Sequence, residues 1–436
     1  MNSRRDLFQA GALAGAAFLG ARRAGAQEGS GPTQDVQVYI EEGHYKARGQ
    51  IDGRVLISSA SADEAIQHAI DSFAGQGGAV CLERGRFVVN RQINLAADVT
   101  LCGKGAASRL WIGPRHDTGV ALFAGDTQDV TVADLSIGSD KGNERARCGV
   151  VLESVGVSTV RDVLCIGLQE RGIWLRRNSF LCEVRGCKIG GAGKSGIFLD
   201  GLAGKGRGGD FVPNLVTNCI VYAGGTGIEA NHTIVANIVG CEVFQSGGPA
   251  FHIHTQSNSV LVSGCRSFQI QDDAVRVEES HEVNISSNIF CWHVGHGIVL
   301  RGAIWGTITG NNVIDTGSIN KGLPPGELPE SIELKNAIYL SGTQGIGVTG
   351  NTIFNWPAAP PMLHGIFEDA ACRNSIFTSN NINYAKKDVV SLGQGSKANA
   401  NVSYLPEPFV GRHPAWLQTF DPHLMELLME QQRGRS

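Results

Sequence analysis

Residues 250–302 contain three copies of one five-residue pattern. Residues 250–254 are Ala-Phe-His-Ile-His, residues 274–278 are Ala-Val-Arg-Val-Glu, and residues 297–301 are Gly-Ile-Val-Leu-Arg. Each copy begins with a small residue and then alternates apolar and variable positions. The copies start at positions 250, 274 and 297, which are 24 and 23 residues apart. A fixed period of this size predicts a solenoid, in which each coil buries its apolar side against its neighbours.

The same pattern continues in both directions along the chain. Further copies start at Gly119, Gly149, Gly172, Gly196 and Gly227 before this stretch, and at Ala337 and Gly365 after it. Alternation with a period of two indicates strands that have one packed and one exposed face. Helical repeats would need apolar residues three and four positions apart, and the pattern lacks them. The copies therefore predict one sheet, called the first sheet, with one strand from each coil.

A second column of residues repeats at the same period. An apolar-x-apolar run is followed two residues later by Cys or Asn at these positions: Cys187, Cys219, Cys241, Cys265, Asn288, Asn311, Asn351 and Asn380. Asn tolerates a left-handed backbone, and its amide can bond the copy one coil above or below. Stacked Asn at a fixed turn resembles the right-handed parallel β-helix superfamily of pectate lyases and polygalacturonases. The resemblance implies an all-β, right-handed parallel β-helix of about ten coils.

A short helix is expected before the coils, at residues 64–73, with Ser61 or Asp63 as its N-cap. Residues 78–105 then resemble the opening of pectate-lyase-like domains, where such a helix covers exposed strand edges. The preceding polar lead-in has no clear period. The predicted divisions of the 436-residue chain are a signal peptide (1–26), the lead-in (27–60), the β-helix (61–401) and a C-terminal tail with a short helix (402–436). Two long connections, within 201–214 and 315–336, are expected to stand beside one face.

The first 26 residues predict an export signal. Residues 3–8, Ser-Arg-Arg-Asp-Leu-Phe, resemble the twin-arginine signature, and an apolar run at 10–20 and the small residues 24–26 follow. The run is too short to span a bilayer. The mature protein is therefore expected to be periplasmic or secreted, without a membrane partner once the signal is cleaved.

Composition adds further limits. The net charge of -4, without a basic run, gives no reason to expect nucleic acid as a partner. Neither charge nor length fixes an oligomeric state. Exported chains often pair their cysteines, but the column position predicts buried thiols for four of the eleven Cys. Pairing of Cys81, Cys102 or Cys372 stays open.

The outward positions of the first sheet form two columns. The first contains Val151, Trp174, Phe198, Glu229, His252, Arg276, Val299 and Tyr339, and the second contains Glu153, Arg176, Asp200, Asn231, His254, Glu278, Arg301 and Ser341. Neighbouring coils lie about 4.8 Å apart, so the charged members should form one patch. A polar centre between aromatic ends suits an extended sugar chain, because sugar rings stack on aromatic rings and the central groups perform acid–base chemistry.

One local motif resembles the polygalacturonase family. Residues 272–277 begin with an Asp pair, and Cys291 and then Gly-His-Gly at 295–297 follow in the next coil. The resemblance implies that Asp272 or Asp273 is an acid or base and that His296 orients it. Gly248-Pro249 replaces the acid of the family in the preceding coil, and Tyr339 and Ser341 replace its Arg and Lys. These departures argue against a standard polygalacturonase.

The patch predicts an exported enzyme that cleaves or modifies a polysaccharide, expected to be acidic, as a lyase, glycoside hydrolase or epimerase. The expected catalytic residues are Glu229, His252, Asp272, Asp273, Arg276 and His296, and the expected substrate-binding residues are Trp174, Phe198, Asn231, His254, Glu278, Arg301 and Tyr339. A hydrolase would use two of the carboxylates, whereas a lyase would use a base and a cation at a uronate.

Other interpretations stay open. A non-catalytic glycan-binding or structural β-helix is the main alternative. The Asp pair could cap a turn, and Glu278 with Arg301 could be a surface charge ladder of little energetic value. His252 and His254 could hold a metal with Asp273 or Glu229, but the preferred prediction has no cofactor; a lyase could add Ca²⁺. Glu368 falls at an inward position, which indicates a bulge or a buried acid.

The export prediction is tested by changing Arg4→Lys together with Arg5→Lys. The double substitution should abolish translocation, because the paired guanidinium groups carry the signal. The measurement is the amount of mature protein in the periplasm, and normal accumulation of the variant would refute the assignment.

Overall fold

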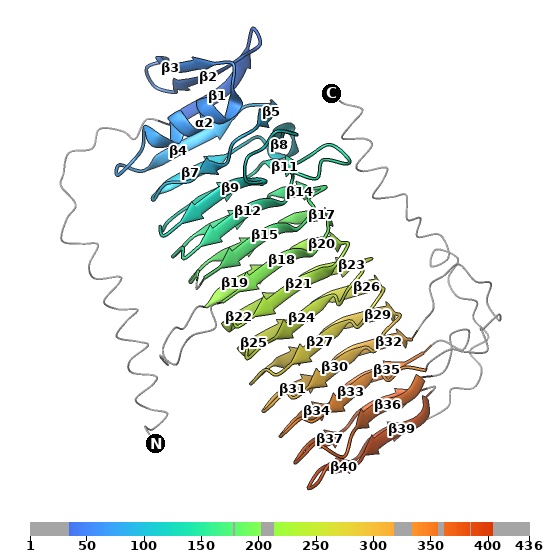
Figure 1. Ribbon diagram of the computed structural model, residues 1–436. Helices are drawn as coiled ribbons and strands as arrows, with labels where there is room; N and C mark the ends of the chain where they lie inside the picture. Colours follow the sequence, from blue (N-terminus) through green and yellow to red (C-terminus); the bar gives the residue numbers. More distant parts are fainter. Residues whose placement is uncertain are drawn as a thin grey trace, which may run out of the picture.

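The computed structural model describes residues 35–177, 179–201, 213–317, 334–355, 362–383 and 385–403. Within these residues the chain winds as a parallel β-helix, with three sheets that run along its length (Figure 1). The alternating pattern turns apolar side chains from all three sheets into one continuous linear core. No helix in the described part of the chain is long and apolar enough to cross a membrane.

The first sheet has twelve parallel strands. Ten contain the copies of the repeat, and one further strand lies at each end. In order they are β6 (Ile93–Asn94), β9 (Val120–Gly125), β12 (Cys148–Glu153), β15 (Arg171–Arg176), β18 (Ser195–Asp200), β21 (Thr226–Asn231), β24 (Phe251–His254), β27 (Val275–Glu278), β30 (Ile298–Arg301), β33 (Ile338–Ser341), β36 (Met362–Glu368) and β39 (Ala385–Ser391). The predicted all-β parallel solenoid is confirmed, but about twelve turns replace the expected ten. The additional turns lie at the two ends, where the repeat pattern is weakest.

The other two sheets complete each coil. The thirteen-stranded sheet contains β5 (Gly85–Val89), β8 (Ser108–Ile112), β11 (Ser136–Gly138), β14 (Leu164–Ile166), β17 (Lys188–Ala192), β20 (Ile220–Ala223), β23 (Glu242–Phe244), β26 (Arg266–Ile270), β29 (Ile289–His293), β32 (Asn312–Thr316), β35 (Thr352–Phe354), β38 (Asn381–Asn383) and β41 (Val402–Ser403). The sixteen-stranded sheet contains β1 (Val36–Glu41), β2 (His44–Gly49), β3 (Val55–Ser59), β4 (Gly78–Leu82), β7 (Val99–Cys102), β10 (Thr131–Ala133), β13 (Thr159–Arg161), β16 (Glu183–Arg185), β19 (Asn214–Thr217), β22 (Ile234–Val239), β25 (Asn258–Ser263), β28 (Asn284–Ser286), β31 (Thr307–Thr309), β34 (Gly347–Thr349), β37 (Ile376–Thr378) and β40 (Lys397–Asn399).

The predicted register is confirmed from the copy at Gly149 to the copy at Gly365, because each copy pairs with the next at equivalent positions. The copy at Gly119 was aligned wrongly. Val150 pairs with Leu122 rather than with Val120, so this strand is shifted by two residues. A shift of two keeps the same side chains inward, and the alternating pattern therefore could not detect it.

The Asn column is a hydrogen-bonded ladder at the corner between the sixteen- and thirteen-stranded sheets. Nδ2 of Asn311 donates to Oδ1 of Asn351 at 2.9 Å and to the carbonyl oxygen of Ile285 at 3.0 Å. Its own Oδ1 accepts from the amide group and the main-chain N–H of Asn288. The same contacts continue through Asn380 to Asn401. Each amide thus satisfies buried groups in the coils on both sides.

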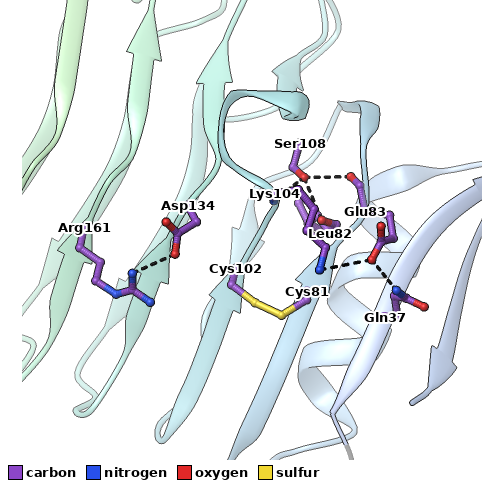
Figure 2. Close-up of a disulfide and its surroundings, with 9 residues drawn as sticks. All are labelled: Gln37, Cys81, Leu82, Glu83, Cys102, Lys104, Ser108, Asp134 and Arg161. Atoms are coloured by element: carbon purple, nitrogen blue, oxygen red, sulfur yellow. Dashed lines mark hydrogen bonds and ion pairs between the residues drawn. A yellow bond between two sulfur atoms is a disulfide. The ribbon is translucent and has the colours of Figure 1, made fainter.

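The structure confirms the buried thiols predicted for the column and shows which of the remaining cysteines form a disulfide. The four ladder cysteines are buried free thiols, and Sγ of Cys265 lies 3.4 Å from two main-chain carbonyl oxygens. Cys372 is also buried and free. Cys81 on β4 and Cys102 on β7 form a disulfide between neighbouring strands (Figure 2), with their Cα atoms 4.5 Å apart. This disulfide joins the first coils of the solenoid.

The N-terminal end of the solenoid is covered as expected, with differences in detail. Helix α2 (Ala62–Asp71) packs against the first strands at the end of the stack (Figure 1). It begins two residues earlier than predicted, and the side chain of Ser61 makes no capping bond. Asp63 is buried and accepts a bond from the main-chain N–H of Asn90. The lead-in, which shows no clear period in the sequence, contains the antiparallel strands β1, β2 and β3.

Glu368 is a buried acid, one of the two predicted alternatives. It is 0% exposed, and the hydroxyl groups of Ser391 and Ser396 donate to its two carboxylate oxygens at 2.6 and 2.9 Å. The main-chain N–H of Gly393 adds a third bond. The export signal, most of both long connections, including Lys205, Arg207 and Asp210, and the helix predicted in the tail lie outside the described residues.

The ladder is tested with Asn311→Ala. The substitution leaves buried donors and acceptors in two adjacent coils without partners, which should lower the free energy of unfolding by about 1–3 kcal/mol. The measurement is the denaturation midpoint. Asn312→Ala is the matched control, because Asn312 is the next residue and is exposed. Equal midpoints for the two variants would contradict the role of the ladder.

Candidate functional site

The outer face of the first sheet carries the predicted columns in the predicted order. Strand pairing aligns the first column from Val151 through Glu229, His252 and Arg276 to Tyr339. In the second column, Asn231 aligns with His254 and Glu278 with Arg301. Glu229, His252, Arg276 and Arg301 lie on β21, β24, β27 and β30, near the middle of the stack in Figure 1.

Two glutamates and two histidines form a group that we call the histidine cluster: Glu229, His252, His254 and Glu278. The two imidazole rings stack with their centroids 4.3 Å apart, because positions i and i+2 of a strand point to the same face. Nε2 of His254 lies 3.1 Å from Oε1 of Glu229, and Nε2 of His252 lies 2.9 Å from Oε2 of Glu278. Each imidazole therefore has its own carboxylate partner.

Further side chains hold the histidine cluster in place. The hydroxyl group of Ser195 donates to Oε2 of Glu229, and Oγ1 of Thr255 lies 2.7 Å from Nδ1 of His254. Nη1 of Arg301 donates to Oε1 of Glu278 at 3.3 Å. The contact between Arg301 and Glu278 is the predicted charge ladder, and it continues directly into the cluster.

The protonation states in the histidine cluster follow from burial and these bonds. Burial lowers the pKa of His252 by more than the bond with Glu278 raises it. Burial alone would raise the pKa of Glu229, but the hydrogen bonds with His254 and Ser195 lower it below its usual value. Burial alone would also raise the pKa of Glu278, but the contacts with His252, Arg276 and Arg301 together lower it below its usual value. At neutral pH both carboxylates are therefore charged and His252 is neutral.

Arg276 is held by the predicted Asp pair. Its Nε donates to Oδ2 of Asp273 at 2.8 Å, and its Nη2 contacts Asp272. Oδ1 of Asp273 accepts the main-chain N–H of His296 at 2.7 Å. Asp273 is only 2% exposed, because it precedes its strand and turns into the corner of the coil. The turn-capping alternative describes the contacts of Asp273.

His296 lies beside this pair and has an unusual anchor. Nδ1 lies 2.9 Å from the main-chain nitrogen of Asn336, which donates to it, and 3.3 Å from the carbonyl oxygen of the same residue. Nδ1 therefore has a partner in either neutral tautomer, the N–H or the carbonyl oxygen of Asn336. Nε2 has no bond to a described residue, so it can accept or donate a proton. Burial lowers the pKa of His296, so its ring is neutral at pH 7. The ring stacks on Tyr339 at 5.1 Å.

The two aromatic ends of the patch differ. Trp174 and Phe198 stack on each other, but the guanidinium of Arg171 lies over both rings, at 4.2 and 4.5 Å from their centroids. Arg176 also lies over Trp174. Phe198 is 5% exposed, so the prediction that it stacks on a sugar is wrong. Long side chains from neighbouring positions cover it.

The other end is a longer run of rings than the sequence indicated. Tyr339 stacks on Phe367 at 5.7 Å, and Phe367 contacts the ring of His364 at 4.9 Å. Nδ1 of His364 lies 2.8 Å from Oδ1 of Asn336. The three rings of Tyr339, His364 and Phe367 keep partial exposure, whereas Asn336 is buried. This end therefore retains aromatic surface beside His296.

The sequence pattern did not indicate several of these contacts, because they involve the position immediately before each copy of the five-residue pattern, where the alternation has not yet begun. In successive coils this position is Asp273, His296, Asn336 and His364. Hydrogen bonds link each of these residues to the next. The same alignment, read one residue earlier, could have found this polar column. Ser195 and Thr255 gave no comparable signal.

One group of side chains has the composition of a metal site. Glu229, His252 and His254 each offer a donor atom, and these atoms lie within 4.8 Å of one another. Of the two carboxylates considered with this histidine pair, Glu229 is therefore the one in position. Asp273 is instead occupied by Arg276 and the main chain of His296.

Comparisons with known proteins concern the fold. A family model described as a right handed beta helix region matches residues 171–353. No curated protein matches the chain. The A-module of the mannuronan C-5 epimerase AlgE6 of Azotobacter vinelandii is similar in structure, with a TM-score of 0.64 and 17% identity over 80% of this chain and 96% of that chain.

Two further solved structures are also similar. The tailspike protein of Escherichia coli bacteriophage HK620, in complex with a pentasaccharide, has a TM-score of 0.53 and 15% identity over 79% of this chain and 63% of that chain. PfbA, a surface adhesin of Streptococcus pneumoniae, has a TM-score of 0.51 and 16% identity over 79% and 87%. At these identities the likeness is one of fold. The chain is thus a right-handed parallel β-helix.

Proposed function

We propose that this protein is an exported carbohydrate-active enzyme that cleaves or modifies an acidic polysaccharide on the outer face of the first sheet. One arrangement carries the proposal: the neutral ring of His296, with Nε2 free among the described residues, stacks on Tyr339, and the main-chain N–H of His296 binds Asp273, which in turn holds Arg276. A positioned imidazole can move a proton, and a guanidinium can bind a carboxylate of the substrate.

The protonation states favour proton abstraction from a uronate over glycoside hydrolysis. Hydrolysis needs a carboxylic acid that stays protonated near neutral pH. In the described patch, Glu229 and Glu278 have lowered pKa values, and both oxygens of Asp273 accept hydrogen bonds. His296 and Arg276 instead supply a neutral proton acceptor and a cation. Elimination or epimerisation at C5 of a uronate is therefore the preferred reaction class, with hydrolysis second.

Other observations support a sugar polymer as the partner. The solved structures similar in fold include a mannuronan C-5 epimerase module and a tailspike protein in complex with a pentasaccharide. The partly exposed rings of Tyr339, Phe367 and His364 give the patch one aromatic end, and aromatic rings stack on sugars. The disulfide between Cys81 and Cys102 suits an oxidising compartment such as the periplasm, as the twin-arginine motif implies.

A non-catalytic glycan-binding protein is the second candidate. The observation that favours it is that Glu229, Glu278, Asp272 and Arg276 all have charged or polar partners within the protein. A fully paired surface network can serve recognition without catalysis. An adhesin is among the proteins of similar fold.

The enzyme proposal is tested with His296→Gln on a panel of uronate and neutral polysaccharides. Losing the proton-transfer group should lower turnover by about 10²–10⁴ with little change in melting temperature. The measurements are ultraviolet absorbance of unsaturated uronates, C5 configuration by NMR, and reducing ends. In the unchanged protein kcat/KM should persist below pH 6.5, the usual His value, because burial lowers the pKa of His296 and keeps its ring neutral there.

The matched control is His44→Gln, because His44 is exposed on strand β2, far along the chain from the patch. It should keep full turnover. Turnover by His296→Gln within a few-fold of the unchanged protein would remove His296 from the mechanism. Reducing ends without unsaturated product would identify a hydrolase, and retention on polymer gels without any product would identify a binding protein.

A further inference from the structure

We infer that the histidine cluster is a binding site for one divalent transition-metal ion of the Zn²⁺ type, with Glu229, His252 and His254 as its ligands. The proton transfer proposed at His296 does not involve this metal site. Three features of the cluster support this inference: the spacing of its donor atoms, the hydrogen bonds around them and its charge.

The donor atoms already lie close to the spacing that a metal requires. One donor from each of the three residues lies within 4.8 Å of the others. A tetrahedral Zn²⁺ with bonds of about 2.0–2.1 Å holds its ligand atoms roughly 3.3 Å apart. Nε2 of His254 and Oε1 of Glu229 are 3.1 Å apart, so this pair needs almost no movement. Rotation of the His252 side chain would close the remaining distance.

The backbone fixes this arrangement through pairing alone. His252 and His254 are two residues apart on β24, so both point outward, and Glu229 is the direct pairing partner of His252 on β21. Three ligands from two adjacent strands therefore share one face without any loop. Two His and one Glu are the ligand set of open zinc sites, which keep a fourth position for water or substrate.

Each proposed ligand is also held by a second polar group, as metal ligands usually are. Ser195 donates to the second oxygen of Glu229, and Thr255 bonds Nδ1 of His254, which directs Nε2 to the site. Glu278 binds Nε2 of His252. The ligand side chains are 17–20% exposed, so an ion can enter from solvent and its open position can face the outside.

Charge favours the same conclusion and selects the ion. Two carboxylates, Glu229 and Glu278, lie within the cluster, and among the described residues the cation that bonds to it is Arg301, at 3.3 Å from Glu278. A divalent ion would balance the remaining negative charge. Two imidazoles suit Zn²⁺, Co²⁺ or Ni²⁺, whereas Ca²⁺ takes oxygen ligands. The Ca²⁺ ion considered for a lyase therefore does not suit this site.

The test measures metal binding by untagged, chelator-treated protein without any polysaccharide, so its result is independent of the proposed enzymatic activity. Equilibrium dialysis with Zn²⁺ should give one ion per chain and a raised melting temperature, since a ligand that binds the native state stabilises it. Co²⁺ should bind at the same stoichiometry and show the intense visible absorption of a tetrahedral site. Ca²⁺ should give neither effect.

Glu229→Gln and His254→Gln should each lower Zn²⁺ affinity at least 10-fold while keeping the melting temperature of the metal-free protein within a few degrees. His281→Gln is the control, because His281 lies between β27 and β28, pairs with Asn258 and Ile304, and is not part of the cluster. This variant should bind Zn²⁺ as the unchanged protein does. Absence of stoichiometric Zn²⁺ binding, or equal binding by all three variants, would overturn the inference and leave the cluster as paired ions.

Discussion

The structure depends on the register in which successive coils stack, and the buried amide ladder is the interaction that holds it. Asn288, Asn311, Asn351 and Asn380 each bond the coils before and after them. A slip of one residue would leave these amides unsatisfied and would also turn every outward side chain of a strand inward. Strand pairing in one register therefore creates the core and the outer patch together.

The patch is a consequence of this stacking rather than of any single loop. Glu229, His252 and Arg276 are separated by more than twenty residues in sequence, yet they are direct neighbours across strands. Partial burial lowers the dielectric around them, so their ion pairs are stronger than exposed pairs. The same burial keeps His252 and His296 neutral at pH 7. Both proposals, proton transfer at His296 and metal ligation at the histidine cluster, therefore rest on the same outer face.

The sequence predicted what depends on period and alternation, namely the solenoid, the Asn ladder and both outer columns. It could not predict what depends on side-chain reach. Phe198 occupies an outward position but is covered by Arg171, and Asp273 precedes its strand, where alternation does not define direction. The copy at Gly119 was misaligned because residues 120–124 are all apolar, so two registers fit equally well. The N-terminal hairpin has no counterpart at the coil period.

We propose above all that an extended sugar chain binds across successive coils at this patch. The most direct measurement is a crystal structure of the protein with an oligosaccharide from a polymer that it retains. We expect sugar rings over β24 to β33, with a ring carboxylate at Arg276 and a sugar carbon near Nε2 of His296. An oligosaccharide bound to the sixteen- or thirteen-stranded sheet, with this patch empty, would contradict it.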